Sequence, residues 1–133
     1  MSSNKKIMII LYSVYGHVET LAKAILEGIS LVDWVKAEIK RVPETENIIH
    51  YDEFPVLTYD KFETMENYDG FLFGMSTRDG MMPAPMKAFW DLTGGKWYKG
   101  SLCGKAAGSS FPVLYTVRSQ LLLPALHTWL TME

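Results

Sequence analysis

The sequence contains a single cysteine, Cys103, among its 133 residues. One cysteine excludes an intramolecular disulfide and a cysteine-rich zinc site, and it suits a reducing compartment. Long apolar runs are also missing. The run Ile7–Leu11 is too short for a secretory signal core, and none approaches the ~18 residues of a membrane span. We therefore expect a cytoplasmic protein without a membrane span.

The chain also has no large excess of positive or negative charge. The chain has 13 Lys and Arg against 15 Asp and Glu, a formal net charge of -2, and its basic residues are scattered singly. Without a basic stripe to neutralise phosphates, a nucleic-acid partner is not expected. No group of His, Asp and Glu has the spacing of a metal site. The composition, 48% hydrophobic, is typical of one globular domain over residues 1–133.

What the chain does contain is an alternation of strands and helices. Its first apolar run continues to Tyr12 without alternating, which indicates a strand covered on both faces, as in parallel sheets. The predicted strands are Ile7–Tyr12, Trp34–Val42, Phe71–Met75 and a fourth that starts over Ala106–Phe111. The predicted helices are Val18–Ile29, Tyr59–Met65 and Pro83–Leu92, with a long connection over Glu44–Asp60 and a glycine-rich loop over Thr93–Trp97. This order predicts an α/β, doubly wound parallel sheet.

The turn between the first strand and the first helix is the segment that suggests chemistry. Ser13–Thr20 (SVYGHVET) leads into a helix N-terminus, whose free N–H groups and partial positive charge suit a phosphate. Ser13 and Thr20 can add hydroxyl donors, and Gly16 lets the backbone approach closely. The turn has neither the lysine of a Walker loop nor a G-x-G-x-x-G pattern. The alternative, that Ser13 only caps the helix, stays open.

Five blocks of the sequence form a recognisable set. They are Ser13–Thr20, Arg41–Thr45, Gly74–Arg78, Phe89–Gly95 with Trp97, and Gly104–Lys105. In this order, over about residues 5–108, they resemble the WrbA family of NAD(P)H:quinone oxidoreductases. The resemblance implies a flavodoxin-like fold, FMN as the cofactor, NAD(P)H as the electron donor, a quinone as the substrate and assembly as a homotetramer.

The resemblance also implies roles for matching residues. It implies an FMN phosphate cradle formed by Ser13, Val14, Tyr15, Gly16, His17 and Val18. It implies that the isoalloxazine ring lies along Thr77, Arg78 and Asp79, and that the substrate pocket is lined by Tyr15 and Trp97. No catalytic acid or base is implied, because the flavin carries the redox chemistry. A solvent-facing His17 and a surface ion pair for Arg78 remain the ordinary alternatives.

The sequence departs from the family in its second and third loops. Asp79 stands where the family usually has an aromatic residue, and a carboxylate there would disfavour an anionic reduced flavin. Phe111–Gln120 replaces a loop rich in glycine, and the apolar segment Leu121–Leu130 matches nothing expected, so residues 109–133 form an atypical tail. We therefore expect an incomplete, truncated flavodoxin-like sheet that lacks the fifth strand and last helix and leaves one sheet face uncovered.

Two functions remain open on these grounds. The first is two-electron reduction of quinones by an FMN-dependent NAD(P)H:quinone oxidoreductase. The second is a non-enzymatic domain that binds FMN weakly or not at all, since the third flavin loop is missing. A phosphoacceptor receiver domain is excluded, because it needs acidic residues at the end of the first strand, where Tyr12 and Ser13 stand.

Overall fold

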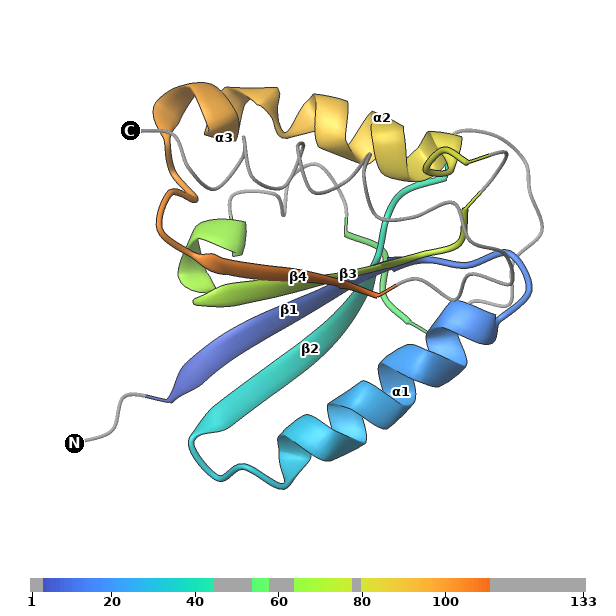
Figure 1. Ribbon diagram of the computed structural model, residues 1–133. Helices are drawn as coiled ribbons and strands as arrows, with labels where there is room; N and C mark the ends of the chain where they lie inside the picture. Colours follow the sequence, from blue (N-terminus) through green and yellow to red (C-terminus); the bar gives the residue numbers. More distant parts are fainter. Residues whose placement is uncertain (1–3, 45–53, 58–63, 78–79, 111–133) are drawn as a thin grey trace.

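The computed structural model describes residues 4–44, 54–57, 64–77 and 80–110. Figure 1 shows the elements in these ranges, which are β1 (Lys5–Tyr12), α1 (His17–Ser30), β2 (Val35–Arg41), β3 (Gly70–Met75), α2 (Ala84–Leu92), α3 (Gly94–Lys99) and β4 (Ala106–Ser110). None of the helices in this part of the chain is long and apolar enough to cross a membrane.

The strands form one sheet in the order β2-β1-β3-β4, and each neighbouring pair is parallel. Ile9 in β1 lies beside Ile39 in β2 and Leu72 in β3, and Leu72 lies beside Gly108 in β4. The chain therefore leaves β1 toward one edge and returns to build the other half of the sheet from β3. This order places a switch point between β1 and β3, and the expected doubly wound parallel sheet is confirmed.

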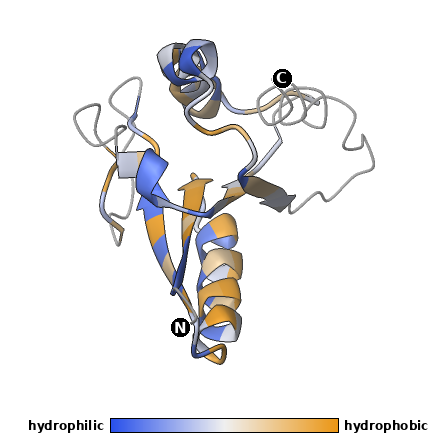
Figure 2. Cartoon of the chain, turned by 90° about the vertical axis from the view of Figure 1, so that its left-hand side faces the viewer, coloured by the Kyte–Doolittle hydropathy of each residue, from blue (hydrophilic) through white to orange (hydrophobic). Residues whose placement is uncertain are grey.

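Alternate residues of β1 enter two cores, one on each face of the sheet. Met8, Ile10 and Tyr12 pack on the side of α2, whereas Ile9 and Leu11 pack on the side of α1. Figure 2 shows the sheet between α1 and the layer formed by α2 and α3. Because successive side chains of a strand point to opposite faces and both faces of β1 are covered, the strand is apolar throughout.

The glycine-rich segment expected as a loop is a helix, so that prediction is wrong. The amides of Lys96 and Trp97 both donate to the Thr93 carbonyl, at 2.9 and 3.1 Å, and start α3 directly after α2. Gly100, at φ 64°, ends α3 in the left-handed conformation typical of helix C-termini. Glycine lowers helix propensity by about 1 kcal/mol per residue, but the hydrogen bonds at this helix junction outweigh that preference.

The other described elements differ from the predicted bounds by at most two residues. The connection after β2 contains one unpredicted feature: Val56 forms a parallel bridge with Arg41, and the Leu57 amide donates to the Arg41 carbonyl at 2.7 Å. Residues 64–67 form a short 3₁₀ turn, while most of the helix expected over Tyr59–Met65 lies outside the described residues. The atypical tail after Ser110 also lies outside them.

Candidate functional site

The candidate site is built on the short turn that joins β1 to α1. Gly16, the residue before α1, has φ 79°, a left-handed conformation that favours glycine. Ser13 is buried at 3% exposure, and its Oγ accepts a hydrogen bond from the Gly16 amide at 3.0 Å. The serine thus closes the turn on itself. The structure therefore supports a turn-holding role for Ser13, although Gly16 rather than Ser13 is the N-cap residue.

The N-terminus of α1 has backbone amides that no intrahelical bond uses. The first intrahelical bond runs from the Thr20 amide to the Gly16 carbonyl, at 3.0 Å. The amides of His17, Val18 and Glu19 precede that bond and have no intrahelical acceptor of their own. A Cβ built on Gly16 would meet nothing within 4 Å. The space beside Gly16 is therefore open, so a group can approach the backbone of the turn at this residue.

The side chains of this turn offer few hydrogen-bond donors to a bound anion. Tyr15 is 76% exposed, and His17 is exposed as well. Thr20 was expected to offer a hydroxyl donor, but its Oγ1 donates to the Gly16 carbonyl at 3.0 Å. Its hydrogen is therefore used within the turn. The donors left to an anion are mainly backbone amides.

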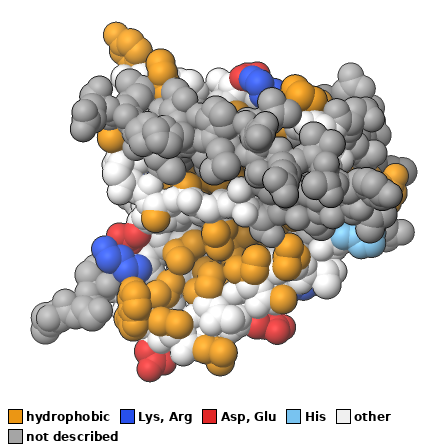
Figure 3. Space-filling model, viewed as in Figure 1, with side chains coloured by type: hydrophobic (Ala, Val, Ile, Leu, Met, Phe, Trp, Pro, Cys, Tyr) orange, Lys and Arg blue, Asp and Glu red, His pale blue; other side chains and the backbone are white. Residues whose placement is uncertain are grey.

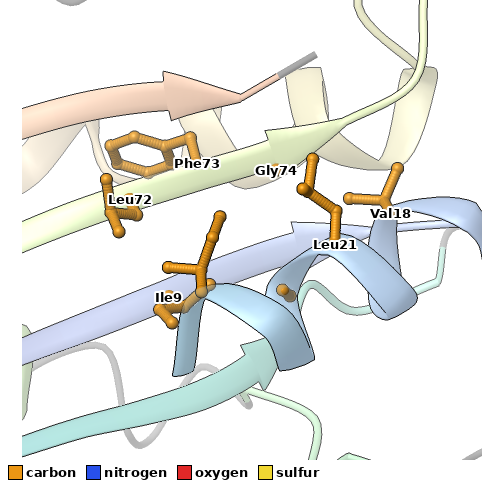
Figure 4. A pocket seen from close by; sticks show the side chains of 8 residues that line it. Ile9, Val18, Leu21, Leu72, Phe73 and Gly74 are labelled. Atoms are coloured by element: carbon orange, nitrogen blue, oxygen red, sulfur yellow. The ribbon is translucent and has the colours of Figure 1, made fainter. Parts of the chain in front are cut away.

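Two valines fix the turn to the sheet from opposite sides. Val14 is half-buried and packs against the α2-side core, whereas Val18 is 2% exposed and belongs to the α1-side core. Figure 4 shows Val18 and Leu21 on α1 directed toward Gly74 and Leu72 of β3. The turn therefore straddles the carboxyl edge of the sheet, and packing on both faces holds the first turn of α1 in place.

The second predicted loop begins beside this turn. Tyr12 pairs with Met75, so the residues after β1 and after β3 leave the sheet as neighbours. Thr77 is half-buried, and Gly80 has φ 77°. Arg78 and Asp79 lie outside the described residues. The structure thus brings Thr77 to the same edge as Ser13, as expected for loops that share one ligand at a switch point.

The third connection also starts at this edge, because the end of β4 at Ser110 pairs with Gly74. Its residues, from Phe111 onward, are outside the described part of the chain. Three connections therefore leave the sheet next to one another, after β1, β3 and β4. Ligands of open parallel sheets bind outside the carboxyl ends of strands, so this edge is the candidate site.

Trp97 lies at the opposite end of the strands, where β1 and β3 begin. It is on α3, beside Lys96, whose Nζ pairs with Glu66 Oε1 at 2.7 Å. Glu66 precedes β3, at the edge where the Asp69 amide donates to the Lys6 carbonyl at 2.8 Å. Since β1 has 8 residues and a strand rises roughly 3.3 Å per residue, the two edges are about 25 Å apart. The structure does not bring Trp97 near Tyr15 within one chain, as Figure 1 also shows for α3 and the start of α1.

The structure also assigns contacts to two matching blocks for which the sequence suggested no role. Arg41 is buried, and its side chain pairs with Glu44 at 3.4 Å. Lys105 Nζ donates to the carbonyls of Glu66 and Tyr68 at 2.5 and 2.6 Å, which ties β4 to the segment before β3. Arg41 and Glu44 are three residues apart, whereas Lys105 contacts carbonyls 39 and 37 residues away in sequence.

The turn has features that suit a phosphate. It combines a helix N-terminus, a glycine without a Cβ and open space around that glycine, which are the features of anion sites built from backbone amides. No lysine occurs between Ser13 and Thr20, so the positive potential comes from the helix itself. The negatively charged phosphate of FMN would suit such a donor set.

Comparisons with known proteins support the resemblance. The chain is 45% identical over 114 residues to a protein of Arabidopsis thaliana named "Probable NAD(P)H dehydrogenase (quinone) FQR1-like 2", which covers 81% of this chain and 42% of that protein. It is 41% identical over 111 residues to an NAD(P)H dehydrogenase (quinone) of Gluconacetobacter diazotrophicus, covering 80% and 55%. It is 43% identical to the NAD(P)H quinone oxidoreductase PST3 of Candida albicans, covering 77% and 54%. No family model matches the chain.

A solved structure shows the fold independently. The flavodoxin, WrbA-like protein from Agrobacterium tumefaciens matches with a TM-score of 0.64 at 19% identity, covering 94% of this chain and 73% of that one. The predicted flavodoxin-like fold is confirmed, and so is the resemblance to WrbA-like quinone oxidoreductases. The chain spans about half the length of the curated relatives it matches.

Proposed function

We propose that this flavodoxin-like relative of the NAD(P)H:quinone oxidoreductases binds FMN at the carboxyl edge of its sheet and reduces quinones with electrons from NAD(P)H. Bound there, FMN would supply the chemistry of taking a hydride from NAD(P)H and passing two electrons to a quinone. The protein would supply binding, orientation and shielding from water. The observation that carries the proposal is the turn with Gly16 at φ 79°, followed by backbone amides of α1 that no intrahelical bond uses.

Each residue of the turn then has a physical role toward the phosphate. The amides of His17 and Val18 would donate to phosphate oxygens at the positive end of α1. Gly16 would let the backbone approach, and Ser13 would keep the turn closed through its bond to the Gly16 amide. Val14 would orient the turn by packing against the α2-side core.

The residues after β3 would contact the ring. Thr77 is the second residue after β3, the strand that neighbours β1, so it leaves the sheet beside the phosphate turn, and Arg78 and Asp79 come next in the sequence. The carboxylate of Asp79 would disfavour an anionic reduced flavin, which lowers the reduction potential of the bound cofactor. This gives the site a stronger tendency to pass electrons on to a quinone.

Substrate contacts would come from two aromatic residues, one of them on a neighbouring copy. Tyr15 is 76% exposed at the edge of the site and would contact the nicotinamide or the quinone. Trp97 is 41% exposed at the opposite edge of the same chain, so it would line the pocket only in another copy. A homo-oligomer in the cytoplasm, with four copies as the resemblance implies, is therefore part of the proposal.

A second candidate function follows from the sequence after β4. Phe111–Gln120 stands where the family has its glycine-rich third flavin loop. A domain with two of three flavin loops would lose several hydrogen bonds, each of ~1–3 kcal/mol when left unmade. The alternative is a non-enzymatic domain with weak or no FMN binding.

The test is a titration of the purified full chain with FMN and, in parallel, with riboflavin, which has the same ring without the phosphate. Flavin fluorescence and the visible spectrum report binding. We expect FMN to bind at least about tenfold more tightly, since one charge-assisted hydrogen bond contributes ~1.5–3 kcal/mol and 1.4 kcal/mol is a factor of ten. Equal binding of both flavins would contradict the phosphate role of the turn.

A matched pair of serine variants locates the effect. Ser13→Ala should weaken FMN binding, whereas Ser30→Ala, at the other end of α1 with its Oγ on the Glu27 carbonyl, should not. Binding by neither flavin would favour the non-enzymatic alternative. If FMN binds, NAD(P)H-dependent reduction of a soluble quinone is measured next, and a bound but inactive flavin would reject the enzymatic part of the proposal.

A further inference from the structure

Strand β2 is an edge of the sheet, because among the strands that the structure describes it pairs with β1 alone (Figure 1). In a strand, the N–H and C=O of one residue point to the same side, and those of the next residue point to the opposite side. The Trp34 carbonyl accepts a bond from the Lys5 amide, and the Val42 amide donates to the Leu11 carbonyl, both toward β1. The main-chain groups of the odd-numbered residues of β2 therefore point away from the sheet.

Both ends of this edge are already bonded within the chain. At the carboxyl end, the Arg41 amide donates to the Pro55 carbonyl at 3.0 Å, and the Arg41 carbonyl accepts from the Leu57 amide at 2.7 Å. At the amino end, the Val35 amide donates to the Val32 carbonyl at 3.1 Å. Only the middle of the strand is left to pair with another chain.

The open part of the edge is centred on Ala37. The N–H and C=O groups of Ala37 and Ile39 and the C=O of Val35 point outward, and within the described residues none of them makes a hydrogen bond. Such a row of main-chain groups is a template for a further strand. On either side of Ala37 stand two exposed residues of opposite charge, Lys36 and Glu38, so a strand that pairs here must match their charges.

A groove of ≈ 380 Å³ runs between α1 and this edge. Its walls include Leu26 and Ile29 of α1 and Val35 and Ala37 of β2, all of them only half-buried. A strand that paired with β2 would cover these apolar side chains. Figure 3 shows that hydrophobic side chains also gather over α1 and β3, but the groove there is lined by apolar residues only, so no charges in it specify a partner.

We propose that the β2 edges of two copies of this chain pair antiparallel about a two-fold axis at Ala37. In this register the two Ala37 residues exchange both of their outward hydrogen bonds, and the Ile39 amide donates to the Val35 carbonyl of the second copy. Lys36 lies opposite Glu38 of the second copy, in a pair without main-chain bonds, where facing side chains are closest. The two-fold axis forms each of these contacts twice.

Other registers are disfavoured by charge or by bonds already made. An axis at Glu38 would put Glu38 opposite itself and Lys36 opposite Lys40, and an axis at Lys36 would put Lys36 opposite itself. Like charges that face one another across a strand pair are destabilising. An axis nearer either end would need main-chain groups of Arg41 or Val35 that are bonded within the chain. One register therefore remains, and a second copy supplies the matching charges.

Charge complementation between two variants tests this register in the full chain without flavin, since the contact uses neither the phosphate turn nor α3. Lys36→Glu alone and Glu38→Lys alone each place like charges opposite one another twice. Each should therefore self-associate about tenfold more weakly than the native chain in sedimentation equilibrium. An equimolar mixture restores opposite charges at both positions and should form heterodimers, detected through a fluorescent label on one variant. Lys99→Glu, at an exposed lysine on α3, is the control and should associate like the native chain. A native chain that stays monomeric, or a mixture that associates no better than its components, would overturn the proposal.

Hydrogen exchange in the native chain tests the edge without any substitution. The amides of Ala37 and Ile39 should exchange more slowly as the protein concentration rises, in proportion to the fraction of dimer, because the second copy gives them acceptors. The amides of Lys36 and Glu38 point toward β1 and are protected within one chain, so they are the internal reference. Association without slower exchange at Ala37 would place the contact elsewhere and reject the proposal. Far-UV circular dichroism and the urea midpoint of each charge variant show whether it is folded, so that weaker association is not confused with a lost fold.

Discussion

Val18 in the first turn of α1 and Gly74 at the end of β3 are in such close contact that no side chain fits between them. A Cβ built on Gly74 would lie 2.9 Å from Cγ1 of Val18, closer than real Cβ contacts. Val18 is 2% exposed and β-branched, so its side chain cannot turn aside easily. This contact fixes the start of α1 against the strand that leads into the second loop.

We expect Gly74→Ala to destabilise the domain by about 1–3 kcal/mol, since an added methyl group overpacks a filled site. The urea dependence of unfolding measures this change. The same variant should also weaken FMN binding, because the first turn of α1 must move away from β3 to relieve the contact. Adding Val18→Ala to Gly74→Ala should recover part of both losses.

A glycine in open space is the control for this substitution. A Cβ on Gly95 in α3 would meet nothing within 4 Å, so Gly95→Ala should stabilise the domain by about 0.5–1 kcal/mol through helix propensity. If Gly74→Ala were as mild as Gly95→Ala, the close contact with Val18 would not constrain the turn. A double-mutant cycle of Val18 and Gly74 should give a coupling of about 0.5–3 kcal/mol.

A substitution of Gly16 tests whether the left-handed backbone of the β1–α1 turn is needed for stability and for phosphate binding. Its φ of 79° is costly for other residues, so Gly16→Ala should lose roughly 1–2 kcal/mol of stability. The control is Gly28→Ala in the same helix, where no atom lies within 4 Å of the new Cβ and the backbone is helical; that change should stabilise α1. If the turn holds a phosphate, the affinity for FMN should fall in Gly16→Ala by a larger factor than the affinity for riboflavin. An equal fall for both flavins would point to general unfolding instead.

The sequence was most informative where one local pattern sufficed. The continuous apolar run of β1, the turn with Gly16 and the amphipathic face of α1 each follow from short-range rules, so the candidate phosphate site could be predicted. The helix α3 could not, because the two glycines that open it argue for a loop, and the Thr93 carbonyl that starts it is supplied by the end of α2. For the same reason the sequence placed Trp97 in a loop, whereas it lies on α3.

Contacts between segments that are distant in sequence could not be predicted either. Lys105 stands in a block that matches the family, yet its Nζ donates to the Glu66 and Tyr68 carbonyls, 39 and 37 residues away in sequence. No spacing rule connects these positions. The sequence could mark Lys105 as part of a resemblance, whereas only the fold shows that it ties the amino ends of β3 and β4 together.

Lys105→Met should therefore destabilise the domain without affecting flavin binding. Two carbonyls would lose a charged donor, and a hydrogen bond to a charged group contributes ~1.5–3 kcal/mol. The loss should appear in urea unfolding, while the FMN dissociation constant measured on the folded variant stays unchanged, since Lys105 lies at the edge away from Gly16. Lys99→Met, an exposed lysine on α3, should change stability by less than about 0.5 kcal/mol. A strong effect of Lys105→Met on FMN affinity alone would contradict this assignment.

Tyr68 and Glu38 give the stability a specific pH dependence. The Tyr68 hydroxyl donates to Glu38 Oε2 at 3.0 Å. Burial first, and then this bond, raise the pKa of Tyr68 from 10.0 to about 12, while the bond from Tyr68 and the nearby Lys40 lower the pKa of Glu38 from 4.5. A raised tyrosine pKa means that the folded state holds this proton more tightly than the unfolded state does.

The stabilisation from Tyr68 is therefore fully present below pH 10, and it is lost as the pH rises from 10.0 through about 12. The stabilisation from Glu38 is present above pH 4.5 and is lost as the pH falls through its lowered pKa. We expect the difference in unfolding free energy between the native chain and Tyr68→Phe to be constant from pH 6 to pH 9. The difference should shrink above pH 10 and below pH 4.5. Because other tyrosines and lysines titrate in both proteins, only this difference is diagnostic, and a difference independent of pH would show that the hydroxyl contributes nothing through Glu38.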